Sequence, residues 1–79
     1  MRVDKFLKVS RVIKRRTVAN EAADAGRVSV NGRPVKASYD VKVGDVVEIA
    51  FASGPVRFRV KQINDSTKKA DSAEMYELL

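Results

Sequence analysis

The 79-residue sequence contains no cysteine and no histidine. Without cysteine, neither a disulfide framework nor a thiolate metal site can form, and this composition suits a reducing compartment, so we expect a cytoplasmic protein. Without histidine, the usual proton shuttle at neutral pH and the commonest metal ligand are both missing. No apolar run approaches the roughly 18 residues that span a bilayer, and the charged N-terminus is unlike a signal peptide. We therefore expect no membrane partner.

Signatures of catalysis are missing as well. The ten acidic residues form no spaced metal or acid/base motif, and the four glycines are scattered rather than gathered in a phosphate-binding loop. Serine or lysine nucleophiles need a nearby base and an enclosing pocket, for which this short chain offers little. The sequence therefore predicts a protein that is not an enzyme, with no catalytic or metal-binding residue and no cofactor.

The net charge of +6 is distributed unevenly along a chain long enough for one small domain. Residues 1–36 hold ten Lys and Arg against three Asp and Glu, a net +7, whereas residues 37–79 hold six against seven, a net −1. A basic half beside a nearly neutral half indicates that a polyanion is bound from one side.

The N-terminal half is helical in pattern. Val3, Phe6 and Leu7 share one helical face and predict a helix over about residues 3–9. Thr17 is a typical N-cap for a second helix over about residues 17–25. Its apolar stripe is expected to be Val18, Ala22 and Ala25, followed by Gly26 in the left-handed conformation. Between the helices, Val12 and Ile13 are expected to anchor a connection that is otherwise basic.

The period then changes to that of β-strands. Val28 and Val30 alternate with a polar residue before the turn Asn31-Gly32, and an extended segment resumes at Pro34. Gly44-Asp45 predicts a second turn before a strand over residues 46–51. A third turn at residues 53–55 precedes a half-buried strand over residues 56–60.

The last residues predict a return to helix. Residues 64–69 are polar and are expected to form a loop, and Asp71 or Ser72 could cap a short helix through residues 74–79. We expect an α+β fold: an αα hairpin packed on a small twisted antiparallel sheet, with a short C-terminal helix. The expected domain covers residues 1–64, with a motif core at 1–51, and residues 65–79 form the loop and last helix.

Seven cations lie within fifteen residues of the N-terminal half. A row of Arg and Lys can match successive phosphates, and Arg adds a planar fork that suits phosphate or stacks on a base. The alternative is a solvated face with helix ion pairs such as Asp4 with Lys8, but acidic partners are few here. The predicted RNA-binding residues are Arg2, Lys5, Lys8, Arg11, Lys14, Arg15 and Arg16.

A second basic row consists of Arg57, Arg59 and Lys61 on the outer face of a strand. These residues are a second candidate set of RNA contacts, although charges on an exposed strand also prevent edge-to-edge aggregation. The phenylalanines occupy core positions, and Tyr39 alone lies in a polar stretch, so no aromatic platform is expected. This favours recognition of folded RNA by shape and phosphate.

Four motifs follow one another along the chain: Arg2-Val3-Asp4-Lys5-Phe6-Leu7, Ser10-Arg11, the run from Ala22 through Gly26-Arg27-Val28-Ser29-Val30-Asn31-Gly32, and Val41 to Gly44-Asp45. Their order and spacing resemble the RNA-binding domain family named after ribosomal protein S-four. Val3 stands where the family usually has Leu. The resemblance implies an αL-type fold whose αα hairpin is the RNA surface. Asp4 is expected to orient a neighbouring Arg rather than contact RNA, because phosphate would repel its carboxylate.

Within the family, residues 8–17, 66–69 and 75–76 resemble the short ribosome-associated quality-control factor of Gram-positive bacteria. That resemblance implies binding to an obstructed large ribosomal subunit, through its ribosomal RNA and peptidyl-tRNA. It also implies support of a partner protein that adds a C-terminal alanine tail without a template, and a monomer away from the ribosome.

Three alternatives remain open. The first is a ribosome-recycling RNA-binding protein like the fifteen-kilodalton heat-shock protein. The second is an RNA-positioning module separated from a pseudouridine synthase or a tyrosyl-tRNA synthetase. The third is a DNA-binding or protein–protein module.

Overall fold

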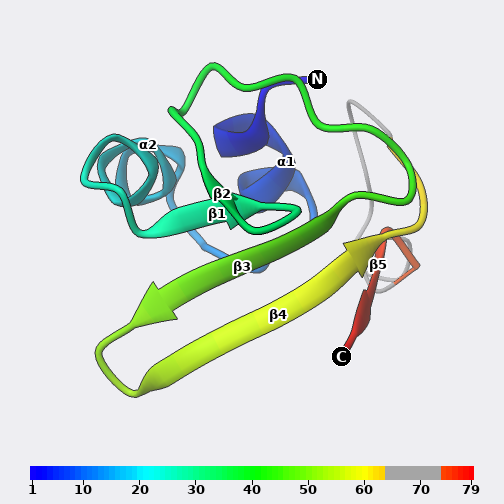
Figure 1. The fold of residues 1–79 in the computed structure, drawn as a ribbon. Helices are drawn as coiled ribbons and strands as arrows, with labels where there is room; N and C mark the ends of the chain where they lie inside the picture. Colours follow the sequence, from blue (N-terminus) through cyan, green and yellow to red (C-terminus); the bar gives the residue numbers. More distant parts are fainter. Residues whose placement is uncertain (64–73) are drawn as a thin grey trace.

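The computed structural model describes residues 1–63 and 74–79, which form two helices and one five-stranded sheet (Figure 1). The strand order is β2-β1-β3-β4-β5, and every neighbouring pair is antiparallel. The predicted α+β class, an αα hairpin on a small antiparallel sheet, is confirmed. The elements are α1 (Val3–Val9), α2 (Arg16–Asp24), β1 (Val28–Val30), β2 (Arg33–Pro34), β3 (Val46–Phe51), β4 (Gly54–Val60) and β5 (Tyr76–Leu78).

The first helix has the predicted bounds, and its apolar residues Val3, Phe6 and Leu7 are fully buried. Its N-terminus is capped by backbone carbonyls rather than by a side chain. The Val3 N–H donates to the Tyr39 carbonyl at 2.7 Å, and the Asp4 N–H donates to that of Ala37 at 3.3 Å. These bonds satisfy donors that a helix leaves unpaired, so the segment between β2 and β3 is fixed across the start of α1 (Figure 1).

The second helix corrects two predictions. It begins at Arg16 with Arg15 at the N-cap position and no side-chain cap, so Thr17 is not its cap. The buried residues are Ala19 and Ala23, whereas Val18 is 45% exposed. Ala22 of the predicted stripe packs partly against the core. Val18 and Ala22 are four residues apart, as are Ala19 and Ala23, so spacing alone does not distinguish the two pairs. In the fold, the small alanine side chains face inward, where a bulkier residue would hold the elements apart.

The end of α2 confirms the role predicted for Gly26. This residue has a φ of +81°, its N–H donates to the Ala23 carbonyl at 3.0 Å, and the Arg27 N–H donates to the Ala22 carbonyl at 2.9 Å. The two bonds form a Schellman motif, which requires the left-handed conformation that glycine adopts without steric cost.

The turns at Asn31-Gly32 and Gly44-Asp45 are confirmed, and they are tied together. Asn31 and Gly32 both have positive φ, as a two-residue type I′ hairpin loop requires. The Asn31 side chain donates to Asp45 Oδ1 at 3.1 Å and accepts the Val46 N–H at 3.0 Å. Asp45 Oδ2 accepts the Lys42 N–H at 2.9 Å. These hydrogen bonds hold the turn at Asn31-Gly32 against the turn at Gly44-Asp45, which explains why both turns carry a polar side chain.

One core lies between the helices and the sheet. The Phe58 ring stacks on Phe6, with centroids 6.2 Å apart, and meets Tyr76 edge-on at 5.3 Å. Since Phe58 and Val60 point into this core, the alternate residues of β4 lie on the sheet face away from the helices. The turn before β4 lies at residues 52–53, earlier than predicted, because Phe51 already pairs with Gly54.

The predicted C-terminal helix is wrong. Tyr76–Leu78 form β5, which pairs with β4 so that Tyr76 lies opposite Val60 and Leu78 opposite Phe58. Met75 is fully buried next to it. Pairing with β4 provides hydrogen-bond partners for the backbone of this segment. The local sequence pattern does not predict that pairing, because β4 is distant along the chain. The predicted loop at residues 64–69, the caps Asp71 and Ser72, and the domain boundary after residue 64 lie outside the described residues.

Candidate nucleic-acid interface

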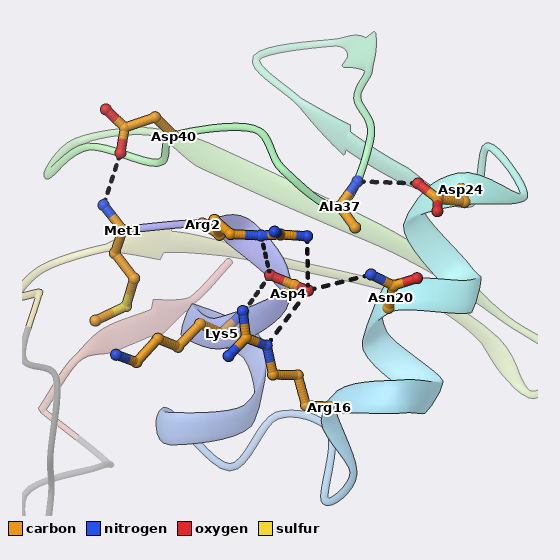
Figure 2. Close-up of polar contacts among 9 residues, drawn as sticks. All are labelled: Met1, Arg2, Asp4, Lys5, Arg16, Asn20, Asp24, Ala37 and Asp40. Carbon is orange, nitrogen blue, oxygen red and sulfur yellow. Dashed lines mark hydrogen bonds and ion pairs between the residues drawn. The ribbon is translucent and has the colours of Figure 1, made fainter.

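The Asp4 carboxylate is the centre of a cluster that joins the two helices. It lies in the first turn of α1, is 2% exposed, and accepts five hydrogen bonds (Figure 2). Arg2 donates from Nε at 3.2 Å and from Nη2 at 3.4 Å, and Arg16 donates from Nε at 3.4 Å. The Lys5 backbone N–H at 2.8 Å and Asn20 Nδ2 at 3.3 Å complete the set. Asp4 therefore orients Arg2, as expected, and Arg16 as well.

The cluster keeps Asp4 ionised. Burial alone would raise the pKa of this carboxyl group, but the hydrogen bonds from Asn20, Arg16 and the Lys5 N–H, together with the charge of Arg16, outweigh that effect. The pKa of Asp4 therefore lies below its ordinary value, and the carboxylate remains a fixed anion at neutral pH.

One carboxylate does not neutralise two guanidinium groups. Arg2 and Arg16 retain side-chain exposures of 49% and 46% while they bond to Asp4. Within the described part of the chain, Arg16 uses only Nε in these bonds, so its two terminal NH₂ groups are available to a ligand. The pair is thus held in a fixed orientation, carries a net positive charge and faces solvent, which suits bidentate binding of phosphate.

Exposed cations continue around the hairpin. Lys8 lies in the last turn of α1, and Arg11, Lys14 and Arg15 lie in the connection; all four are exposed and have no acidic partner among residues 1–63 and 74–79. Ile13 is 6% exposed, so the connection is anchored as predicted. Lys5 is partly buried, and its side chain extends away from the carboxylate (Figure 2). We call the seven predicted cations the basic hairpin: Arg2, Lys5, Lys8, Arg11, Lys14, Arg15 and Arg16.

Arg11 has an unusual backbone for a residue with a side chain. It follows the C-cap Ser10 with a φ of +64°, and its N–H donates to the Lys8 carbonyl at 3.1 Å. Glycine is usual at this position because the left-handed conformation costs other L-residues about 1–2 kcal/mol. Arg11 therefore has a strained backbone, and its guanidinium group lies in the connection between the two helices.

A hollow of about 290 Å³ lies beside the cluster. It is lined by Asp4, Arg16, Thr17, Asn20 and Glu21. Asn20 was not singled out from the sequence, although its position four residues after Arg16 places both on one face of α2. Knowledge of which face of α2 meets α1 would have indicated it.

The second basic row is separate from this cluster. Arg57, Arg59 and Lys61 are exposed on the sheet face away from the helices. Arg59 forms an ion pair with Glu77 at 3.6 Å, and Arg57 lies opposite Glu48 in the register of β3 and β4. Cross-strand carboxylates therefore offset part of this charge, and an RNA contact here stays a prediction.

Over the residues that the structure describes, no group of three or more Asp or Glu is arranged to hold a metal ion. In the same residues, neither helix has the length and apolar character to cross a membrane.

The fold and the hairpin define a class of domain. Residues 1–47 match the family model described as the S4 domain. The solved trimeric structure of Vibrio cholerae Heat Shock Protein 15 superposes with a TM-score of 0.91, covering 100% of this chain and 81% of that one. Its sequence identity is 24%, so this likeness concerns the fold.

Within this class of domain, the chain is similar in sequence to a set of proteins that share one name. The chain is 57% identical over its full length to the RQC P-site tRNA stabilizing factor of Streptococcus pneumoniae strain R6, of which it covers 90%. It is 54% identical to the protein of the same name from Bacillus subtilis strain 168, of which it covers 92%. The chain therefore belongs to the S4-domain family and, within it, to the group formed by these proteins.

Proposed function

We propose that this protein is a non-catalytic RNA-binding factor that acts in ribosome-associated quality control in the cytoplasm. The observation that carries the proposal is the Asp4 cluster, in which Arg2 and Arg16 are fixed around one buried carboxylate, half-exposed and incompletely neutralised. Relatives that match the chain over its full length carry a name that refers to RQC and to P-site tRNA. Our proposal extends that role to this chain.

The RNA contacts proposed are the seven residues of the basic hairpin. Asp4 is the single acidic side chain within residues 1–16 and bonds Arg2 and Arg16, so RNA phosphates supply counter-charges to Lys8, Arg11, Lys14 and Arg15, which have no acidic partner among the described residues. Asp4 does not touch phosphate, which would repel it; it holds Arg2 and Arg16 in the orientation in which RNA meets them. Recognition then depends on the shape and phosphates of folded RNA rather than on base edges.

The finer proposal concerns the particle that is bound. A large ribosomal subunit that still holds a peptidyl-tRNA presents ribosomal RNA and tRNA next to each other, and a small domain with a concentrated charge can bridge the two. By stabilising that tRNA, the protein would support a partner that extends the stalled chain with alanine without a template. We propose a monomer away from the ribosome.

Co-sedimentation tests this proposal directly. Large subunits that carry peptidyl-tRNA and vacant large subunits are mixed with the protein, and the bound fraction is measured at rising salt. We expect preferential binding to the loaded subunits and a marked loss of it for Arg16→Ala. Equal binding to both particles would contradict the tRNA-dependent role, and equal binding by Arg16→Ala would contradict the site.

A further inference from the structure

A second hollow adjoins the N-terminal end of the basic hairpin. It has a volume of about 490 Å³ and lies between the β1–β2 hairpin and the segment that follows it. Its lining residues are Val30, Asn31, Arg33, Pro34, Val35 and Tyr39. Tyr39 is 37% exposed, unlike Phe6 and Phe58, which are fully buried in the core. Its ring is therefore available to a ligand, and we call this cavity the Tyr39 hollow.

The backbone joins the Tyr39 hollow to the proposed RNA surface. The Tyr39 carbonyl accepts the Val3 N–H at 2.7 Å, and Asp40 pairs with Arg2 in an isolated antiparallel bridge. Tyr39 is thus fixed one residue from the pairing partner of Arg2, whose guanidinium belongs to the Asp4 cluster (Figure 2). The Tyr39 backbone is thereby attached to the start of α1, where the basic hairpin begins.

The charges around the hollow suit a nucleotide. Arg33 lines it, is exposed, and has no ion-pair partner in the described part of the chain. The nearby carboxylates are already bonded: Asp40 to the N-terminal ammonium at 2.6 Å, and Asp45 to Asn31 and the Lys42 N–H. An aromatic ring that stacks on a base, together with an Arg that binds the adjoining phosphate, is the usual means of holding an unpaired nucleotide.

We infer that the Tyr39 hollow binds one unpaired nucleotide of the RNA whose folded part occupies the basic hairpin. The base stacks on the Tyr39 ring, and Arg33 contacts the phosphate next to it. This inference rests on the proposed function and adds a second kind of recognition to it. The basic hairpin binds phosphates of structured RNA, and the Tyr39 hollow selects RNAs in which a base is free beside that structure.

The test separates the two sites by measuring binding to matched RNAs. A short blunt-ended RNA duplex is compared with the same duplex carrying a single unpaired purine, as a bulge in one version and a 3′ overhang in another. We expect the wild-type protein to bind a version with the unpaired purine more tightly. Tyr39→Phe should keep this gain. Tyr39→Leu should bind the RNA with the unpaired purine at least about five-fold more weakly than wild type does, because leucine keeps the apolar bulk but not the aromatic face.

Binding to the fully paired duplex should be the same for wild type, Tyr39→Phe and Tyr39→Leu. Arg33→Gln should reduce the gain but not the binding to the paired duplex, and the Tyr39 ring protons should shift only with the unpaired purine. No gain in the wild type, or a gain that Tyr39→Leu retains, overturns the inference and leaves the basic hairpin intact. If wild-type protein binds neither RNA, the proposed function fails, and the inference fails with it.

Discussion

Replacement of Arg11 by glycine should separate RNA binding from stability. The residue is exposed, its side chain has no acidic partner in the described residues, and its φ of +64° lies in the left-handed region. Most substitutions at a functional surface change binding and leave stability equal or lower. Arg11→Gly should instead raise the free energy of unfolding while it lowers the affinity for RNA, because the strained backbone and the positive charge belong to the same residue.

The magnitude follows from two opposing effects. Relief of the left-handed conformation is worth about 1–2 kcal/mol, and the greater freedom of glycine in the unfolded chain costs about 0.5–1 kcal/mol. The two ranges leave a net stabilisation of between about 0 and 1.5 kcal/mol, and their midpoint of about 0.75 kcal/mol raises the melting temperature of a domain of this size by roughly 3–6 °C. Loss of one phosphate contact should reduce the slope of log K against log salt by about 0.7–0.9.

Arg11→Ala is the matched variant, because it removes the same charge but keeps a Cβ in the left-handed conformation. Arg27→Ala controls for net charge, since Arg27 is exposed after α2 and outside the basic hairpin. Thermal unfolding and RNA titrations at several salt concentrations give both quantities for all three proteins. The reasoning is refuted if Arg11→Gly is no more stable than Arg11→Ala, or if Arg27→Ala weakens binding as much as the Arg11 variants do.

Three further outcomes are expected. Asp4→Ala should lower the free energy of unfolding, measured in urea, by about 2–3 kcal/mol, because it removes a buried carboxylate that accepts several hydrogen bonds. The loss should not be larger, since water can solvate the half-exposed Arg2 and Arg16. The same variant should weaken RNA binding, because the two arginines are no longer held in place. The pKa of Asp4 is lowered by folding, so its ionisation stabilises the protein above the ordinary pKa of 3.8 and this contribution is lost as pH falls through the folded pKa. Wild type and Asp4→Asn should therefore converge in stability on acidification, and a constant difference would argue against this. Gly26→Ala should cost about 1 kcal/mol in thermal unfolding, through strain at a φ of +81°, with RNA affinity unchanged.

The first helix and the turns could be predicted because their signals are local. Val3, Phe6 and Leu7 mark one face of α1, and Asn31-Gly32 requires two positive φ values that few other pairs tolerate. Gly26 likewise reports its own backbone conformation. In each case the residue type and the structure are linked within a few positions of the chain.

The errors arose where packing between distant segments decides. Val18 and Ala19 each begin a stripe of period four, and only the packing of the hairpin shows that the alanine stripe is buried. Residues 76–78 become a strand because β4 offers an edge with which to pair. Asn20 joins the site for the same reason, since its contact with Asp4 spans sixteen residues. The basic hairpin was predicted from the density of cations over residues 2–16 and from the family resemblance, whereas the geometry that fixes Arg2 and Arg16 required the fold.

The central claim is that RNA meets this protein on the helical hairpin, through Arg2 and Arg16 held by Asp4. The most direct measurement is backbone and arginine side-chain NMR of the protein titrated with a structured ribosomal or transfer RNA. The account predicts that the largest shifts fall on α1, the connection and the start of α2, together with the Nε signals of Arg2 and Arg16. Shifts concentrated on Arg57, Arg59 and Lys61 of the outer sheet face, with the hairpin unperturbed, would contradict it.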